Sequence, residues 1–396
     1  MNNIKILRVR YEHVSLFKDG ILDMNLTAMD KMTDKAQAYH LNSSIYTQKL
    51  LAIIGINASG KTTTLKLLNF ALGIVLDNAN LNASLGILDL LEDEARVVVD
   101  FFGAGKYFQW EALIGKGGAG RKLENPLYFK EEFLRSKDQK TVKTKKEMSD
   151  FSQVRQVTTV QRTKLSEDTL SVLKDSDSIV IRATRHNDTA LRQMMPFTNI
   201  NMLTTRGTTP GVILQAFDSN IETLTSNVEA GTFSYKIKFN NKSKEITINN
   251  PFDLANVISS GTIKGQNIMF YIREVLQNGG YLIVDELENH LNKELLRMIT
   301  DIFKSDEINK NGACLIFSTH YTEILDFMDR KDNIYIVRRQ RASDNAIELL
   351  NYSKEFPRKS NDVKKSEVIL SNFIKGTAPS YEYIQALKKN LCNEVW

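Results

Sequence analysis

A glycine-rich segment at residues 55–62 has the residue types and spacing that a phosphate chain requires. The segment fits the pattern G-x-x-x-x-G-K-[ST], with the sequence Gly55-Ile56-Asn57-Ala58-Ser59-Gly60-Lys61-Thr62, and Thr63 follows it. Its glycines allow several backbone N–H groups to point at one anion, and a helix that starts there adds partial positive charge. In such a loop Lys61 would reach the β- and γ-phosphates, and Thr62 would offer its hydroxyl to Mg²⁺.

The sequence on either side of this segment is what a phosphate loop needs. The apolar run at residues 50–54 predicts a buried strand, and the apolar periodicity of residues 62–76 predicts a helix. A glycine turn that arose by chance would lack this context. We therefore expect residues 55 and 57–63 to bind ATP with Mg²⁺.

A second cluster of chemical groups follows the apolar run at residues 281–284. Asp285 and Glu286 stand at the end of this run, as in a Walker B strand. Asp285 would hold Mg²⁺ directly or through water, and Glu286 would polarise the attacking water. A buried strand that ends in surface acids gives the same pattern, but the phosphate loop favours the catalytic interpretation.

Two further short stretches lie at informative distances from Asp285. Ser259-Ser260-Gly261 precedes it, with 24 residues from Gly261 to Asp285, and His320 follows 35 residues after Asp285 at the end of another apolar run. Alone, Ser-Ser-Gly is usually a turn, and a lone histidine at a strand end is usually structural. Their order and spacing together with the other two stretches point to one composite site.

In these four stretches the sequence resembles the ABC-type ATPases. Ser259, Ser260 and Gly261 match the signature motif, residues 288–292 match the loop after Walker B, and His320 matches the switch histidine. The details of residues 55–61, 259–262 and 285–291 are similar to the branch of overcoming-lysogenization-defect (OLD) and abortive-infection (AbiL-type) ATPases, with DNA-repair and SMC heads as more distant relatives.

The resemblance implies an α/β fold and a composite site. The expected fold is an ABC-type P-loop NTPase head, with a mixed sheet flanked by helices, N-terminal antiparallel strands and a helix-rich insertion. It implies a homodimer or higher oligomer in which the signature of one chain completes the phosphate site of another. Glu286 and His320 would be the catalytic residues, and Thr62 and Asp285 the metal-binding ones. It also implies a role in antiphage defence, with a separately encoded nuclease or toxin as effector.

Three positions depart from the family pattern. Residues 13–17 lack the arginine that many relatives carry in an N-terminal motif, Asn292 replaces an Asp or His, and Ser260 replaces a glycine. The missing arginine predicts slow hydrolysis and leaves ATP binding intact. The 76 residues after His320 contain no Glu plus Asp-x-Asp set, so we expect no nuclease activity in the chain itself.

Three other functions are compatible with parts of the sequence. A DNA-binding, repair-like or SMC-like ATPase would use basic segments such as residues 137–146, with five lysines, or residues 338–341, with three arginines. Both segments also fit a solvated loop, and no heptad pattern predicts a coiled-coil arm. A transporter subunit and a scaffold that binds ATP without turnover are the remaining alternatives.

Composition excludes several classes of protein. The chain has 396 residues, of which 42% are hydrophobic and 25% charged, and a net charge of +5. These values are ordinary for a globular protein and permit nucleic-acid contact without requiring it. No apolar run is long enough to span a membrane, the N-terminus lacks a signal peptide, and there are only two cysteines. We expect a cytoplasmic protein with no membrane partner.

The order of predicted elements suggests three regions. Residues 1–120 would form the first half of the ATPase core, residues 121–245 a helix-rich insertion, and residues 246–396 the second half. Within them the patterns predict the following elements: strands at 4–10 and 21–26, a helix at 84–94, a hairpin at 97–113, a strand at 179–181, helices at 189–195 and 212–224, a hairpin at 232–248, and a last helix at 381–391.

Overall fold

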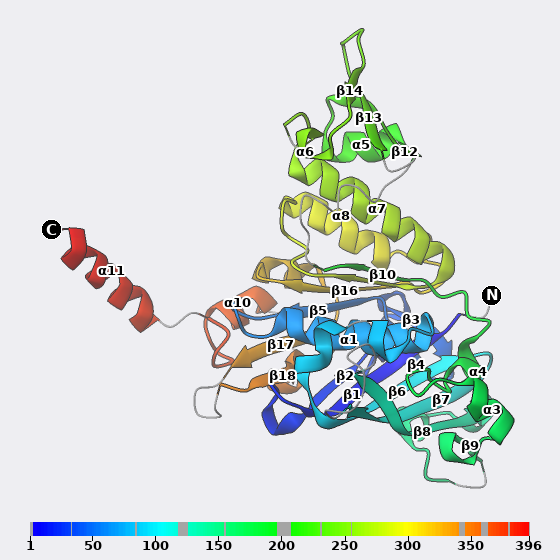
Figure 1. The fold of residues 1–396 in the computed structure, drawn as a ribbon. Helices are drawn as coiled ribbons and strands as arrows, with labels where there is room; N and C mark the ends of the chain where they lie inside the picture. The colour runs from blue at the N-terminus through cyan, green and yellow to red at the C-terminus, as the bar shows by residue number, and fades with distance from the viewer. Residues whose placement is uncertain are drawn as a thin grey trace.

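The structure is a computed structural model. It describes residues 3–32, 34–83, 85–117, 126–153, 156–195, 207–229, 232–254, 256–339, 345–357, 363–378 and 381–395. Figure 1 shows a body built on two sheets, a smaller lobe above it, and a C-terminal helix, α11 (Tyr381–Val395), that stands apart. No helix in the described ranges is long and apolar enough to cross a membrane.

A mostly parallel sheet forms the centre of the body. Its strand order is β10-β15-β16-β5-β17-β18, in which neighbours from β10 to β17 are parallel and β18 is antiparallel to β17. The carboxyl ends of the parallel strands meet at one edge, where the phosphate loop, Asp285 and His320 follow their strands. The six strands are β5 (Leu50–Ile54), β10 (Leu191–Met194), β15 (Tyr281–Val284), β16 (Cys314–Thr319), β17 (Ile334–Arg339) and β18 (Ile347–Asn351).

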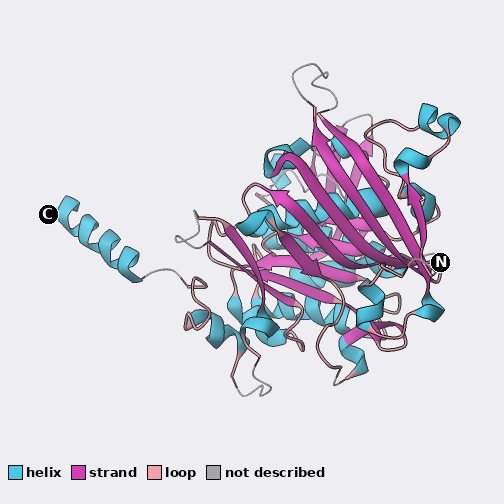
Figure 2. Ribbon diagram, turned by 90° about the horizontal axis from the view of Figure 1, so that it is seen from below, coloured by secondary structure: helices cyan, strands magenta, loops and turns pink. Residues whose placement is uncertain are grey.

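A second sheet is antiparallel and has the order β2-β1-β6-β7-β8-β9. Its long strands are seen in Figure 2. They are β1 (Lys5–Val14), β2 (Leu22–Asn25), β6 (Leu91–Gly103), β7 (Lys106–Lys116), β8 (Leu127–Asp138) and β9 (Thr158–Gln161). A separate two-stranded sheet consists of β3 (Ala38–Asn42) and β4 (Ile45–Gln48).

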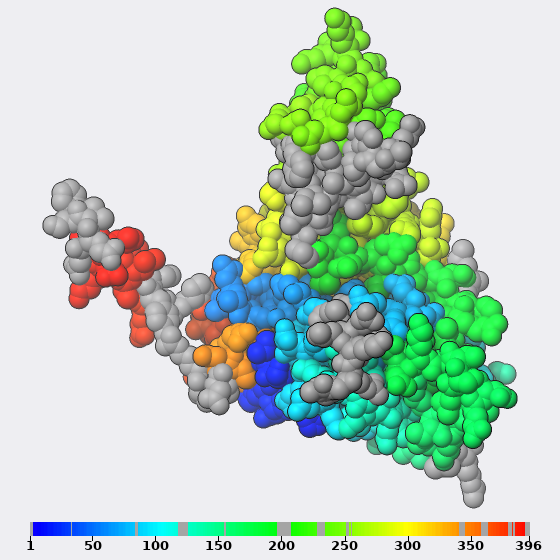
Figure 3. Space-filling view, in the orientation of Figure 1, coloured from blue at the N-terminus to red at the C-terminus, as the bar shows by residue number. Residues whose placement is uncertain are grey.

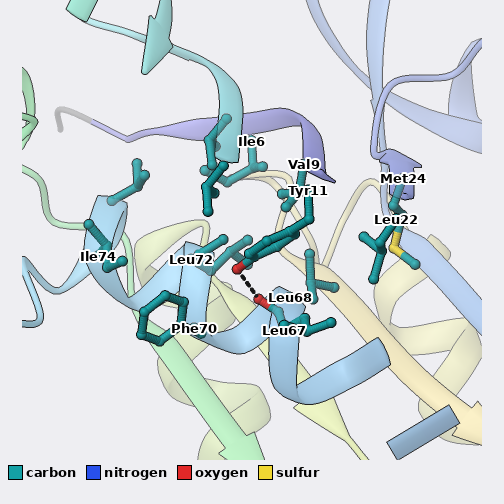
Figure 4. Close-up of a cluster of buried hydrophobic side chains, with 14 of the residues drawn as sticks. Ile6, Val9, Tyr11, Leu22, Met24, Leu67, Leu68, Phe70, Leu72 and Ile74 are labelled. Carbon is teal, nitrogen blue, oxygen red and sulfur yellow. Dashed lines mark hydrogen bonds between the residues drawn. The ribbon is translucent and has the colours of Figure 1, made fainter. Parts of the chain in front are cut away.

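Helix α1 (Lys61–Leu76) lies between the two sheets. Its buried side chains share one core with the antiparallel sheet and with alternate residues of β5, namely Leu51 and Ile53. Figure 4 shows part of this core, in which the Tyr11 hydroxyl donates to the Leu67 carbonyl oxygen at 2.7 Å. Because both ends of α1 are held by buried contacts, the phosphate loop at its start rests on a fixed base.

The other face of the parallel sheet is covered by helices. Leu50, Ala52 and Ile54 of β5 point into this second core, which includes buried residues of α7 (Ser260–Asn278) and α8 (Lys293–Lys304). Burial on both faces explains why residues 50–54 form an unbroken apolar run. The remaining short helices of the body are α2 (Lys145–Ser149), α3 (Glu167–Val172), α4 (Ile181–Thr184), α9 (Tyr352–Glu355) and α10 (Lys365–Leu370).

The described part of residues 207–258 forms a separate lobe, which we call the apical lobe. It has a four-stranded antiparallel sheet, and its small core includes Ile263 of α7. Figure 3 shows the lobe protruding from the body. Its elements are β11 (Gly207–Thr209), α5 (Gly211–Phe217), β12 (Ile221–Glu229), β13 (Thr232–Phe239), β14 (Ile246–Ile248) and α6 (Pro251–Leu254).

Several of the predicted strands are present. The strands at 4–10 and 21–26 pair antiparallel, and the hairpins at 97–113 and 232–248 are formed. The α/β class, the mixed sheet and the N-terminal antiparallel strands are confirmed.

The helix-rich character expected for residues 121–245 is wrong for the described residues. They contribute β8 and β9 to the antiparallel sheet, β10 to the parallel sheet, and β11 to β13 to the apical lobe, whereas their helices have 4 to 7 residues. The abundant Lys, Glu and Arg favour a helix by propensity, but pairing of β8 along the whole of β7 overrides that preference.

Four smaller predictions are also corrected. Residues 91–94 of the expected helix at 84–94 belong to β6, and residues 191–194 of the expected helix at 189–195 form β10. The expected strand at 179–181 is a turn that leads into α4. The helix expected at 212–224 ends at Phe217, because the Asp218 carboxylate accepts from the Asn220 N–H at 2.9 Å and turns the chain into β12.

Candidate functional site

The phosphate loop joins β5 to α1 in a conformation that needs its two glycines. Gly60 has a φ of +112°, and a Cβ at that residue would lie 2.5 Å from the Ile347 side chain. A Cβ at Gly55 would lie 2.2 Å from the Val337 carbonyl oxygen. Asn57 and Ala58 are exposed at the crest of the loop. The loop therefore presents its backbone to solvent while β17 and β18 support it from behind.

Lys61 is buried beneath this loop. Its Nζ donates to the carbonyl oxygens of Gly55 at 3.0 Å and Ile56 at 3.2 Å, and lies 3.3 Å from Nδ1 of His320. Burial lowers the pKa of Lys61, and the charges of Asp285 and Glu286 oppose that shift. An ammonium in this position can bind phosphate oxygens near the loop.

Thr62 and Asp285 meet at the start of α1. The Thr62 hydroxyl donates to Oδ2 of Asp285 at 2.6 Å, and the Ser318 hydroxyl donates to Oδ1. Hydroxyl and carboxylate oxygens are the ligands that Mg²⁺ prefers, so these residues fit the expected ion. Within the described ranges no group of three His, Cys, Asp or Glu residues is arranged to hold a metal, so Mg²⁺ here would depend on phosphate oxygens and water for its other ligands.

Glu286 lies beside His320 at the same edge of the sheet. Its Oε1 is 3.4 Å from Nε2 of His320, and its Oε2 accepts from the Asn289 side-chain amide. The backbone of Glu286 has a φ of +49°, a strained value for a residue with a side chain. The Glu286 N–H donates to the Ser318 hydroxyl at 2.7 Å. Ser318 therefore holds both acidic residues of the Walker B strand.

Three buried polar groups around these residues received no individual role from the sequence. Besides Ser318, the Glu288 carboxylate accepts from the backbone N–H of His320 at 2.6 Å, and Lys264 of α7 donates to the carbonyl oxygens of Glu286 and Leu287. A buried lysine in a helix has the same sequence pattern as an exposed one. The Glu-x-Glu spacing at Glu286 and Glu288 was the one available signal.

The signature residues lie at the start of α7. Ser259 caps the helix, because its hydroxyl accepts from the Thr262 N–H at 3.1 Å, and it is exposed. The Ser260 hydroxyl is 2.9 Å from Nδ1 of His290, and a Cβ at Gly261 would lie 2.5 Å from the His290 carbonyl oxygen. Among the described residues, the hydrogen bonds of Ser259 and Ser260 and the close approach at Gly261 are with Thr262 and the loop after Asp285, and none is with the phosphate loop of the same chain.

Arg339 is a further cation beside the phosphate loop. It is exposed at the end of β17, and its Nε donates to the Ala58 carbonyl oxygen at 3.0 Å. Its Nη1 donates to the Asn345 carbonyl oxygen at 2.9 Å. The solvated turn predicted at residues 338–341 therefore includes a direct support for the crest of the loop.

A cavity of about 480 Å³ opens next to these groups. It is lined by Gly55, Ile56, Asn57 and His320, and also by Leu370 of α10 and by Thr377. Space beside His320 is what an incoming nucleotide, or a neighbouring chain, would need.

The structure brings together Lys61, Thr62, Asp285, Glu286 and His320. Each of these residues follows the carboxyl end of a parallel strand, which is where ligands bind in open α/β sheets. The arrangement can hold a triphosphate with a divalent ion and can direct a carboxylate at a water molecule.

Comparisons with known proteins agree with this arrangement. Residues 50–326 match the protein family described as "AAA domain, putative AbiEii toxin, Type IV TA system". No curated protein matches the chain. Among solved structures, the recombination mediator protein RecF with ATP, from the RecFOR pathway, aligns at 8% identity and a TM-score of 0.38, covering 88% of this chain and 100% of that one. We draw no functional conclusion from a likeness of that size.

The matched residues make up more than half of the chain and contain the phosphate loop, Asp285 and His320. The chain therefore belongs to this family of AAA-domain proteins.

Proposed function

We propose that the protein hydrolyses ATP as a dimer in which two chains bind nucleotide and Mg²⁺ head to tail. Each chain lends Ser259, Ser260 and Gly261 to the phosphate loop of the other. The observation that carries the proposal is the separation of the two halves of the site. Lys61, Thr62, Asp285, Glu286 and His320 converge at one edge of the sheet, whereas exposed Ser259, among the residues that the structure describes, forms hydrogen bonds within its own helix.

Each residue has a distinct role in the proposed reaction. Residues 55 and 57–63 bind the phosphates, with Lys61 on the β- and γ-phosphates. Thr62 and Asp285 hold Mg²⁺, which would supply charge neutralisation on the phosphates. Glu286 orients the attacking water and receives its proton as the bond between the γ-phosphorus and ADP breaks. His320, 3.4 Å from Glu286, keeps that carboxylate directed at the γ-phosphate.

In this arrangement ATP joins the two chains. The γ-phosphate is contacted by Lys61 of one chain and by the helix start at Ser259 of the other, so its loss removes the contact that holds the dimer closed. Turnover then sets how long the closed state lasts. Residues 1–120 and 246–396 would act as the two halves of this ATPase head, together with β8, β9 and β10 from the segment between them.

We further propose that the closed dimer regulates a separate effector in an antiphage abortive-infection system. Two observations support this: the family's description mentions a putative toxin of a type IV toxin–antitoxin system, and the sequence is similar to OLD-like and AbiL-type ATPases. In this reading the effector is a nuclease or toxin encoded separately. Expression of the wild type and of Glu286→Gln, each with and without the adjacent reading frame, would test it through growth after infection.

Mixing two inactive variants tests the shared site. Lys61→Ala removes the phosphate ligand, and Ser259→Arg places a bulky cation at an exposed position where a second chain must approach. Neither variant should turn over ATP alone. In an equal mixture, mixed dimers contain one intact site, so about a quarter of the wild-type activity should return. Sites complete within one chain would predict an active Ser259→Arg protein and no gain on mixing.

The basic segment at residues 137–146 gives no support to a DNA-binding role. Lys137 donates to the Asp150 carbonyl oxygen at 2.5 Å, and Lys145 donates to that of Met29 at 2.8 Å. Two of the five lysines therefore hold the fold together. DNA binding that strengthens with ATP and weakens with salt would contradict this reading.

A further inference from the structure

Lys264 is a buried cation that joins α7 to the Walker B loop. It lies one helical turn beyond the signature and is 0% exposed. Its Nζ donates to the carbonyl oxygen of Glu286 at 2.9 Å and to that of Leu287 at 3.1 Å. Burial lowers the pKa of Lys264 to about 8, and the nearby charge of Glu288 opposes the shift. A cation is costly to bury, so this one needs its carbonyl partners.

These contacts fix the backbone of Glu286 from a second side. Its N–H is held by Ser318 of β16 at 2.7 Å, and its carbonyl oxygen is held by Lys264 of α7. Because its φ of +49° is strained, this conformation persists only while its surroundings hold it. The Glu286 side chain is 42% exposed, so its direction depends on the backbone, on the contact with His320 and on the hydrogen bond from the Asn289 side-chain amide.

The same helix carries the apical lobe. Gly265 packs so closely on the lobe that a Cβ there would lie 2.2 Å from the ring of Phe217. The next residue, Gln266, donates from its side-chain amide to the Thr209 hydroxyl. Ile263 lies in the core of the lobe. Ile263, Gly265 and Gln266 thus contact the lobe, while Lys264 between them contacts Glu286. A tilt of the lobe would therefore act on α7 beside Lys264.

We propose that Lys264 is a positioning residue through which α7 and the apical lobe set the orientation of Glu286 for hydrolysis. The inference rests on the proposed role of Glu286 and adds a route of regulation to it. When α7 holds the Glu286 carbonyl oxygen, the carboxylate is aimed at water. When the lobe shifts α7, ATP stays bound but is cleaved slowly. A partner that binds the lobe would then change turnover more than ATP affinity.

The first test replaces Lys264 by Met, which keeps much of the side-chain volume and removes both hydrogen bonds. We expect kcat to fall about 10- to 100-fold, because a small misplacement of a catalytic group has that effect. The dissociation constant for ATP should stay within about twofold of the wild-type value, because the hydrogen bonds to be removed go to the backbone of Glu286 and Leu287, outside the phosphate loop, and Lys264→Arg should restore part of the rate.

Lys5 provides a matched control. It is also a buried lysine, 2% exposed, and its Nζ donates to the carbonyl oxygens of Gly279 at 2.8 Å and Gly312 at 2.7 Å. These residues precede β15 and β16, at the end of the sheet opposite to the site. Lys5→Met should lower the melting temperature without lowering kcat of the folded protein. An equal loss of kcat in both Met variants would overturn the proposal.

Combination with Glu286→Gln separates this inference from the proposed function. If Lys264 acts through Glu286, then Lys264→Met added to Glu286→Gln should not lower the residual rate further. A further tenfold loss would show that Lys264 acts elsewhere. If Glu286→Gln alone kept the wild-type rate, the proposed function would be wrong, whatever Lys264 does.

The lobe can be tested without touching Lys264. Gly265→Ala puts a methyl group against the Phe217 ring, so it should tilt the lobe on α7 and lower kcat with little change in ATP affinity. Adding Phe217→Ala removes the clash and should recover most of the rate. If Gly265→Ala stays folded and kcat does not change, the lobe does not act on the site. This measurement also decides the question if Lys264→Met fails to fold.

Discussion

His320 and Glu286 form the contact on which the proposed chemistry depends. Nε2 of His320 lies 3.4 Å from Oε1 of Glu286, while Nδ1 of the same ring lies 3.3 Å from the Lys61 amine. One imidazole therefore links the carboxylate that would activate water to the lysine that would bind the γ-phosphate. A nucleotide that draws Lys61 toward its phosphates would change the contact of Lys61 with His320 and, through His320, the contact with Glu286.

Glu286→Gln should uncouple ATP binding from hydrolysis. The amide keeps the shape of the side chain but cannot accept a proton, so kcat should fall by about 10²- to 10⁴-fold. ATP should still bind, and the dimer should remain closed for longer. Steady-state turnover and light scattering with ATP would measure the two effects. Glu294→Gln, at an exposed residue of α8, should match the wild type. Wild-type turnover in Glu286→Gln would remove Glu286 from its proposed role.

Thr62→Val should weaken ATP binding only when Mg²⁺ is present. Valine keeps the volume of threonine but removes the hydroxyl that donates to Asp285 at 2.6 Å and that would ligate the ion. The expected loss of affinity is roughly 10- to 100-fold with Mg²⁺ and small with EDTA. Thr62→Ser should keep most of the affinity. Calorimetric titration of ATP in the presence of Mg²⁺ and in the presence of EDTA would measure the two affinities. Equal losses of affinity under the two conditions would count against a metal-binding role for Thr62.

The central sheet and the site edge were predictable because local patterns specify them. A few consecutive residues are enough to recognise each of these features. They are the phosphate-loop pattern at residues 55–62, the apolar runs before Asp285 and before His320, and the paired strands near the N-terminus. Parallel strands place their carboxyl ends at one edge, so the convergence of Lys61, Asp285 and His320 follows from their positions in the sequence.

Strand β8 and the role of Lys264 were not predictable because they depend on contacts between distant segments. Residues 127–138 are rich in charge, which favours a helix, yet they pair with β7 along its length. Lys264 is separated by 22 residues from Glu286, whose carbonyl oxygen it binds, and nothing in the sequence distinguishes it from an exposed helical lysine. Tertiary pairing and burial decide both cases.

Arg339→Gln should reduce affinity for ATP without changing the fold. The guanidinium donates to the Ala58 carbonyl oxygen at 3.0 Å, so its loss should loosen the crest of the phosphate loop. A hydrogen bond to a charged group is worth about 1.5–3 kcal/mol, so the dissociation constant should rise by about tenfold or more. Arg182→Gln, at an exposed residue of α4, removes the same charge elsewhere and should have no effect. If the two variants bound ATP with equal affinity, Arg339 would have no role in supporting the phosphate loop and would only be part of a solvated turn.

The burial of Asp100 should make the stability of the protein depend on pH in a specific way. This residue of β6 is 2% exposed, and its carboxylate accepts from the Gln109 side-chain amide at 3.0 Å. Burial raises the pKa of Asp100 from 3.8 to about 6, while the Gln109 hydrogen bond and the charge of Arg8 oppose the shift. Between these two values the folded protein keeps a proton that the unfolded chain has lost, so stability falls as pH rises from about 4 to about 6.

Asp100→Asn should remove this pH dependence. Its carbonyl oxygen can still accept from Gln109, and no charge is buried at high pH. Relative to the wild type, the variant should gain up to roughly 3 kcal/mol in the free energy of unfolding between pH 4 and pH 7.5, as a shift of about two pKa units requires. Urea denaturation at both pH values measures the difference. Asp93→Asn, at an exposed residue of the same strand, should show no such gain. If the two variants changed equally with pH, the cost would not come from burial of Asp100, because burial is what distinguishes the two carboxylates.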